Sequence, residues 1–288
     1  MMTMARTASH NSLPDYDRPP VVETVLGVQF ERLTAFHNAH LGAYWKSLDN
    51  DVWTRVADAP LLASQFERFT ETAQWSRGVQ LQLTQDPACR LQISNASGDR
   101  MIQVQNGRLH FNWVGTGGGG YPRYASVRKG FVEVLDLFEK HIVDEKLGDF
   151  RPNQWEVTYV NHIAKGTVWN TPRDWNFFSP LASLPRFEGV VDGESFQGEW
   201  HFVIPERRGR LHVQWQHGVK ASPGLQEMIV LTLTARGPLG DEVVGGAAND
   251  RQKVLEGLDS GRETIVRFFR HAMSRSANEY WGLNDVDD

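Results

Sequence analysis

Cysteine is almost absent from this sequence, since Cys89 is the only one among 288 residues. A single thiol excludes an intramolecular disulfide, a thiolate zinc cluster and an iron–sulfur cluster held by the chain's own thiolates. Long apolar runs are absent as well. No stretch approaches the roughly 18 residues that cross a bilayer, and residues 1–17 lack the apolar core of a secretory signal. We therefore expect a cytoplasmic protein that does not contact a membrane.

Runs of basic residues are also missing. The 30 lysines and arginines are scattered along the chain, and together with 35 acidic residues they give a net charge of −5. Indiscriminate binding to nucleic acid needs a basic surface that neutralises several phosphates, so a nucleic-acid partner is not favoured. Hydrophobic residues make up 40% of the chain, with 10 tryptophans and 15 phenylalanines, which is enough apolar surface for a globular fold.

What is present is a pattern of secondary structure that occurs twice. Residues 1–18 are polar and aperiodic, and we interpret them as a disordered arm. Residues 19–150 predict a strand, a helix, a four-strand meander and a long helix, and residues 151–288 predict a second half of similar order. The fold class that we expect is α+β and internally duplicated, with two antiparallel sheets that are each covered on one face by a long helix.

Periodicity and turn signals place the individual elements. In the first half, residues 21–33 alternate as a strand, whereas residues 36–48 and 60–69 have helical spacing. The Asn106-Gly107 pair is a strong hairpin signal. The meander strands are predicted over 78–85, 89–94, 100–105 and 108–114, and the long helix over 124–143. The second half is predicted to have strands over 155–168, 195–204, 209–217 and 228–236, and a closing helix over 249–273.

This order of elements resembles the duplicated folds of the TATA-box-binding-protein type. One short sequence also recurs, because residues 107–113 are similar to residues 209–215. The spacing of this repeat is shorter than the spacing between corresponding strands and helices of the two halves. We therefore do not take the repeat as evidence for the duplication.

Two terminal motifs resemble those of an uncharacterised, sporadically distributed bacterial protein family. The first is Pro-Pro-Val-Val-Glu at residues 19–23, and the second is Trp-Gly at residues 281–282. The resemblance implies a role in bacterial defence or toxin control, with a protein partner encoded by a neighbouring gene. Histidines that such sequences carry near the second motif and in the last helix are replaced here by Asn278 and Arg262. The resemblance therefore does not predict a histidine active site.

One face of the predicted meander is rich in hydrogen-bonding side chains. A sheet with a helix over its apolar face leaves the other face open, either as plain solvent-facing surface or as a recognition surface. Glutamine, arginine, histidine and asparagine can read a partner, whereas a merely soluble face carries more lysine and glutamate. The candidate partner-binding residues on this face and its counterpart in the second half are Arg90, Gln103, Gln105, Arg108, His110, Asn112, Arg210, His212 and Gln214.

Three residues of the second half form an alternative candidate site. Glu199 and His201 lie two apart on one face of a predicted strand, and His212 is expected on the neighbouring strand. This arrangement suits an acid/base pair and equally suits an ordinary cross-strand polar contact. A pocket near these three residues would indicate an enzyme or a small-ligand-binding protein.

A glycine-rich loop precedes the first long helix. Residues 115–120 fit the spacing G-x-G-x-x-G, but a dinucleotide site needs a parallel crossover unit, and the strand before this loop belongs to an antiparallel meander. A weaker hypothesis is an anion held at the start of the helix by Gly117, Gly118, Arg123 and Arg128. The simpler interpretation is a flexible tether.

The leading hypothesis is a non-enzymatic recognition protein whose polar sheet face, or the cleft between its halves, binds a macromolecule. We predict no catalytic residues, no metal and no cofactor. The alternatives are an enzyme or small-ligand-binding protein with a pocket near Glu199, His201 and His212, and a structural subunit of a homo-oligomer.

Overall fold

The structure is a computed structural model that describes residues 13–69, 89–115, 120–182, 189–191, 193–220, 224–239 and 250–284. Its strands are β1 (Asp15–Tyr16), β2 (Val21–Phe30), β3 (Arg55–Ala59), β4 (Arg90–Ser94), β5 (Arg100–Gln105), β6 (Arg108–Val114), β7 (Pro152–Ala164), β8 (Gln197–Ile204), β9 (Gly209–Lys220), β10 (Gln226–Pro238) and β11 (Leu283–Asn284). Its helices are α1 (Asn38–Ser47), α2 (Tyr124–Asp144), α3 (Asp250–Ala272) and α4 (Arg275–Tyr280), with short 3-10 turns η1 (Trp175–Phe177), η2 (Ser179–Leu181) and η3 (Pro205–Arg207).

Nine strands form a single antiparallel sheet in the order β3-β4-β5-β6-β2-β7-β10-β9-β8. The prediction of an α+β protein with antiparallel strands is confirmed, but the prediction of two separate sheets is wrong. β2 and β7 pair with each other at the centre, so each covers the edge that the other would otherwise expose. The order is symmetrical about this pair, with β6 opposite β10, β5 opposite β9 and β4 opposite β8.

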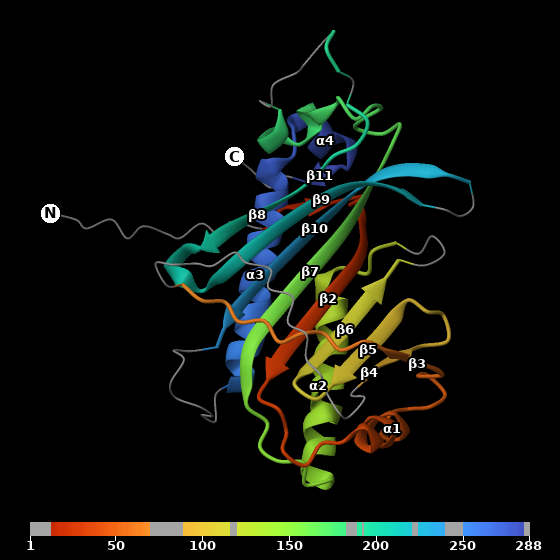
Figure 1. Ribbon diagram of the computed structural model, residues 1–288, viewed down its shortest axis with the longest axis vertical. Helices are drawn as coiled ribbons and strands as arrows, with labels where there is room; N and C mark the ends of the chain where they lie inside the picture. Colours follow the sequence, from red (N-terminus) through yellow and green to blue (C-terminus); the bar gives the residue numbers. More distant parts are fainter. Residues whose placement is uncertain are drawn as a thin grey trace, which may run out of the picture.

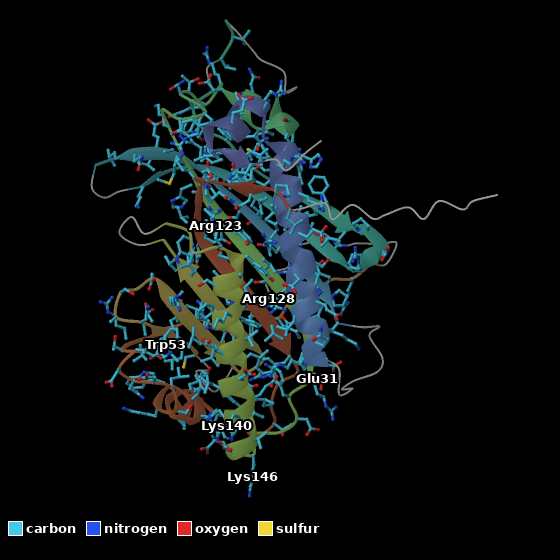
Figure 2. All side chains as sticks on the ribbon, turned by 180° about the vertical axis from the view of Figure 1, so that it is seen from behind. Glu31, Trp53, Arg123, Arg128, Lys140 and Lys146 are labelled. Atoms are coloured by element: carbon cyan, nitrogen blue, oxygen red, sulfur yellow. The ribbon has the colours of Figure 1, made fainter. Side chains whose placement is uncertain are left out.

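The two long helices lie side by side on one face of the sheet, behind it in Figure 1 and in front of it in Figure 2. α2 packs on β2 and β6, and α3 packs on β7 and β10. Each helix carries its buried apolar residues at spacings of three and four, as a helix that covers a sheet requires. Leu26 and Val28 of β2 are fully buried beneath the helices.

Trp155 on β7 lies in a slot formed by four glycines. A Cβ atom added at Gly257 or Gly261 of α3 would lie 2.2 or 2.6 Å from the indole ring, and one at Gly209 or Gly237 would lie 3.0 or 2.7 Å from it. The absence of four side chains therefore lets the ring fit between α3 and the sheet. This close approach sets the distance of the helix from the sheet, because interiors are packed without spare volume.

Residues 60–69, here called the strap, cross the opposite face of the sheet. In Figure 1 the strap is the orange segment that runs in front of the strands. The prediction of a helix over these residues is wrong. The backbone N–H groups of Leu62, Gln65 and Glu67 donate to glutamine side chains of the sheet rather than to carbonyls within the strap. Tertiary contacts have thus replaced the local hydrogen bonds that a helix would need.

Among the described residues, no helix is both long and apolar enough to cross a membrane.

The glycine slot generates a first prediction. We expect Gly257→Ala to lower the free energy of unfolding by about 1 to 3 kcal/mol, because the added methyl group overlaps the Trp155 ring. The matched control is Gly42→Ala in α1, where an added Cβ meets nothing within 4 Å and should raise stability by up to about 1 kcal/mol. Urea unfolding followed by circular dichroism measures both, and equal effects of the two substitutions would contradict the slot.

Candidate functional site

The polar face that we expected to be open is crossed by the strap, and most of the candidate residues on it are buried. Six of the candidate partner-binding residues have exposed fractions of 8% or less; these are Gln103, Gln105, Arg108, His110, Asn112 and Arg210. Arg90 and His212 are half-buried, and Gln214 alone of the set is exposed. The prediction of an uncovered face is therefore wrong. The polar side chains do point to this side of the sheet, but other parts of the same chain bury most of them.

Three glutamines from three strands hold the backbone of the strap. Gln105 donates to Leu62 O at 2.8 Å and accepts from Leu62 N at 2.9 Å. Gln29 makes the same pair of bonds with Gln65, at 3.0 and 2.9 Å. Gln154 of β7 accepts from the backbone N–H of Glu67 at 3.2 Å. A side-chain amide has the donor and the acceptor of a peptide group, so these glutamines act like a neighbouring strand.

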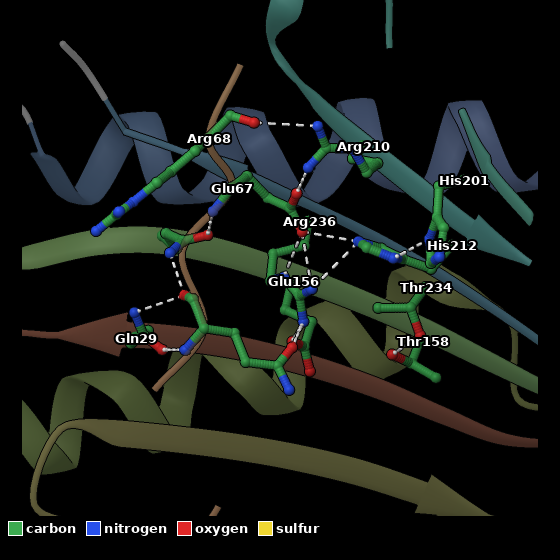
Figure 3. Close-up of polar contacts among 12 residues, drawn as sticks. Gln29, Glu67, Arg68, Glu156, Thr158, His201, Arg210, His212, Thr234 and Arg236 are labelled. Atoms are coloured by element: carbon green, nitrogen blue, oxygen red, sulfur yellow. Dashed lines mark hydrogen bonds and ion pairs between the residues drawn. The ribbon is translucent and has the colours of Figure 1, made fainter. Parts of the chain in front are cut away.

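Glu67 is the centre of a buried polar network at the far end of the strap (Figure 3). Its carboxylate accepts from Arg236 Nε and Nη2 at 2.9 and 2.8 Å, lies 2.7 Å from His212 Nε2, and is paired with Arg210. Arg210 also donates to Arg68 O at 3.1 Å. Burial alone would raise the pKa of Glu67, but the hydrogen bonds and positive charges of His212 and Arg236 lower it from 4.5 to about 2. Glu67 is therefore ionised and tightly held.

The structure brings Glu199, His201 and His212 together beside this network. β8 and β9 pair so that His201 lies directly opposite His212. The Nδ1 atoms of the two rings are 2.8 Å apart, and His201 Nε2 lies 3.1 Å from Glu199 Oε1. Burial, followed by the neighbouring His212, lowers the pKa of His201. An unbroken chain of contacts thus runs from Glu199 through both imidazoles to Glu67.

The remaining polar residues on this face form contacts with each other. Asn112 donates to Glu23 at 2.6 Å and accepts from Gln103 at 3.0 Å, and Gln103 also accepts from Arg90 at 2.7 Å. His110 Nε2 lies 3.7 Å from a carboxylate oxygen of β7, and burial lowers its pKa to about 4. Side chains that we predicted to bind a partner are thus paired within the chain.

A cavity of about 440 Å³ lies on the other face of the sheet, between the start of α2, the middle of α3 and the N-terminal segment 13–21. Its walls are mostly apolar. The apolar lining includes Leu13, Val21, Leu233, Ile265, Val266 and Phe269, and the polar lining includes Tyr121, Arg123, Tyr124, Tyr159, Asn161 and Arg262. Figure 2 shows this face, with Arg123 labelled close to the start of α2.

Arg262 is the polar group of the cavity with the fewest partners. Its Nε atom is buried and has no hydrogen-bond partner within the described part of the chain. Its Cζ atom lies 5.0 Å from the centre of the Tyr124 ring, over which the guanidinium stacks. Nearby, the hydroxyls of Tyr121 and Tyr159 are 2.9 Å apart. Burial raises the pKa of both tyrosines, so both remain protonated; one hydroxyl donates to the other, which leaves one proton of the pair for another acceptor.

The two described residues of the weaker anion hypothesis, Arg123 and Arg128, are each paired with a different carboxylate. Arg123 lines the cavity but is paired with Asp15 at 2.8 Å, and Arg128 is paired with Asp259 at 2.8 Å across the two helices. Gly117 and Gly118 lie outside the described residues. The anion hypothesis stays a prediction, and among the described residues Arg123 alone connects it to the cavity.

Comparison with known proteins gives no match: no protein-family model, no curated protein and no solved structure is similar to this chain.

Reasoning from the sequence missed the residues that organise both regions. Glu67 lies in a segment that we predicted as a helix, and no signal in the sequence links it to Arg236, which is far away along the chain. Arg262 was noticed only as the replacement of a histidine. One signal was available, since an arginine among the closely spaced apolar residues of a buried helix face is unusual.

The Glu67 network generates a second prediction. At pH 7 we expect Glu67→Gln to lower the free energy of unfolding by about 3 kcal/mol, because it leaves two buried arginines without their shared carboxylate. The folded-state pKa is depressed, so this contribution is complete above pH 4.5 and is lost as the pH falls through about 2. The difference in free energy of unfolding between the native protein and the variant should therefore decrease from pH 7 to pH 4 and again to pH 3, as measured by urea unfolding.

Glu31→Gln is the control for this measurement, because Glu31 is exposed and lies 3.8 Å from Arg151. It should change stability by less than about 0.5 kcal/mol. A Glu67→Gln protein as stable as this control would show that the strap is not anchored through the carboxylate.

Proposed function

We propose that this protein binds a small organic anion with an apolar body, in the cavity between α2, α3 and the sheet. The observation that carries the proposal is the incompletely paired Arg262 in a mostly apolar cavity. An arginine is always charged, and a buried guanidinium N–H that lacks an acceptor is costly. A carboxylate or sulfonate of a ligand would supply that partner through charge-assisted hydrogen bonds.

The dimensions and lining of the cavity fit a small molecule. Its volume of about 440 Å³ falls within the range of roughly 300 to 1,000 Å³ that is usual for ligand sites. Leu233, Ile265 and Phe269 offer apolar surface to the body of a ligand, and the hydroxyl pair of Tyr121 and Tyr159 offers one further donor. This combination of apolar walls and a few convergent donors favours an amphipathic anion over a sugar or a nucleotide.

The start of α2 adds a second source of positive potential. Its N-terminal turn reaches the cavity, and no side chain caps it within the described chain. The first N–H groups of a helix and its dipole favour a negative charge nearby. The acid group of the ligand is therefore expected to lie between this turn and Arg262, where both contributions add.

We also infer that the two halves of the chain arose by duplication, in the manner of folds of the TATA-box-binding-protein type. The symmetrical strand order supports this inference, whereas the repeated short sequence does not, because it falls on β6 and β9 and the symmetry relates β6 to β10. The cavity lies at the junction of the halves, since β2, β7, α2 and α3 all contribute to it. Such junctions are common positions for ligand sites.

The hypothesis of a macromolecular partner on the polar sheet face stays a prediction. A partner on that face would have to displace the strap, together with the glutamine bonds and the Glu67 ion pairs that hold it. The cavity needs no such rearrangement, and for that reason we favour the small ligand.

The proposed function generates a third prediction. Octanoate, an anion with a short apolar chain, is expected to bind the native protein with one site in isothermal titration calorimetry. Arg262→Gln should weaken that binding by about 10-fold or more, because it removes a charged donor. Binding of uncharged 1-octanol should be unaffected by the substitution, since the apolar walls stay intact.

Arg267→Gln is the matched control, because Arg267 lies on the same helix and is paired with Glu263 outside the cavity. It should leave octanoate binding within twofold of the native value. Thermal unfolding separates function from structure, since Arg262→Gln should not lower the melting temperature. Octanoate binding that is absent, or equally strong in the Arg262 variant, would overturn the proposed function.

A further inference from the structure

We propose that Glu199, His201 and His212 form a binding site for a divalent transition-metal ion of the zinc type, with Glu67 orienting His212 from behind. This site lies on the strap face of the sheet, whereas the cavity lies on the helix face, so the two are independent. No part of the proposed function requires the metal, and the metal does not require the ligand.

The backbone pairing of β8 and β9 places the three side chains. His201 and His212 are directly opposite each other in the ladder, and Glu199 lies two residues before His201 on the same face of β8. One candidate ligand atom from each residue lies within 4.8 Å of the other two. Two adjacent strands of a large sheet form a rigid support, which keeps the cost of assembling the site low.

The separations between the candidate ligand atoms are close to those of a zinc site. Zinc ligated by imidazole nitrogen at about 2.0 Å in a tetrahedron has neighbouring ligand atoms about 3.3 Å apart. The Nδ1 atoms of His201 and His212 are 2.8 Å apart, whereas Glu199 Oε1 lies 3.1 Å from Nε2, the other nitrogen of the His201 ring. Side-chain rotation that aims one nitrogen of each ring and the Glu199 carboxylate at a common point, with about 3.3 Å between ligand atoms, would complete the site.

Glu67 gives His212 the orientation of a metal ligand. Its carboxylate lies 2.7 Å from His212 Nε2, which leaves Nδ1 directed at His201. Histidines that bind metals almost always donate their other ring N–H to a carboxylate or carbonyl in this way. Arg210 and Arg236 pair with Glu67, so Glu67 remains a fixed acceptor and does not itself reach the ion (Figure 3).

The site is accessible, and its donors select the kind of ion. The side chains of Glu199, His201 and His212 are 28%, 22% and 15% exposed, so an ion from solvent can reach them. Two imidazoles and one carboxylate suit zinc, whereas magnesium and calcium prefer oxygen ligands. Three protein ligands leave a fourth position for water, which is the arrangement of open zinc sites.

The test uses the full-length protein, freed of metal by dialysis against a chelator, and titrates it with zinc chloride in isothermal titration calorimetry. We expect one ion per chain. His201→Asn and His212→Asn should each weaken binding at least 100-fold, and Glu199→Gln at least 10-fold. Cobalt chloride provides a second readout, because cobalt in a tetrahedral site of nitrogen and oxygen ligands absorbs strongly in the visible range, and this absorption should disappear in the histidine variants.

His37→Asn is the control, since His37 is exposed at the start of α1 and outside the cluster. Its zinc affinity should stay within twofold of the native value. Glu67→Gln tests the positioning role and should weaken zinc binding 10- to 100-fold while the visible spectrum of bound cobalt is retained.

Circular dichroism of each variant establishes that it is folded before its affinity is compared. A native protein that takes up no stoichiometric zinc, or folded histidine variants that bind zinc as tightly as the native protein, would overturn the proposal. The Arg262→Gln variant should bind zinc normally, so failure of the metal site and failure of the proposed function are separate results.

Discussion

The burial of Glu67 against two arginines is the interaction on which the rest of the structure depends. A carboxylate removed from water costs several kcal/mol unless charges and hydrogen bonds surround it, and Arg210, Arg236 and His212 supply both. These partners belong to β9 and β10, whereas Glu67 arrives from the first half of the chain. The ion pairs therefore fix the strap at one end and connect the two halves on the face that the helices leave uncovered.

The two faces of the sheet have different roles. On the strap face, polar side chains of the strands bind a segment of the same chain. Most of their hydrogen bonds are made to other described residues. On the helix face, α2 and α3 cover an apolar core but leave a cavity where the halves meet. A polar surface that looks suited to recognition is thus internal structure, and the cavity that we propose for a ligand lies among apolar side chains.

Local patterns predicted the elements whose partners are near in sequence or whose apolar stripe is long. The helix expected over 124–143 is α2, the hairpin expected at Asn106-Gly107 joins β5 and β6, and the closing helix is α3. The strap could not be predicted, because its conformation is set by glutamines on strands that are distant in sequence. β3 was missed because its five residues are mostly exposed and do not alternate. The two predicted sheets form one sheet because β2 pairs with β7. This pairing could not be predicted from local patterns, since the two strands are far apart in the sequence.

The strap has one more consequence. It contacts β5 through Leu62, β2 through Gln65, and β9 and β10 through Glu67, so one short segment runs transversely over most of the width of the sheet. Neighbouring strands of a sheet rotate relative to one another by an amount that is otherwise free to vary. Because the strap is bonded to several strands, these strands cannot rotate relative to one another independently. Because α2 and α3 lie on the two halves of one face of this sheet, the gap between the helices depends on the twist that the strap restricts from the opposite face.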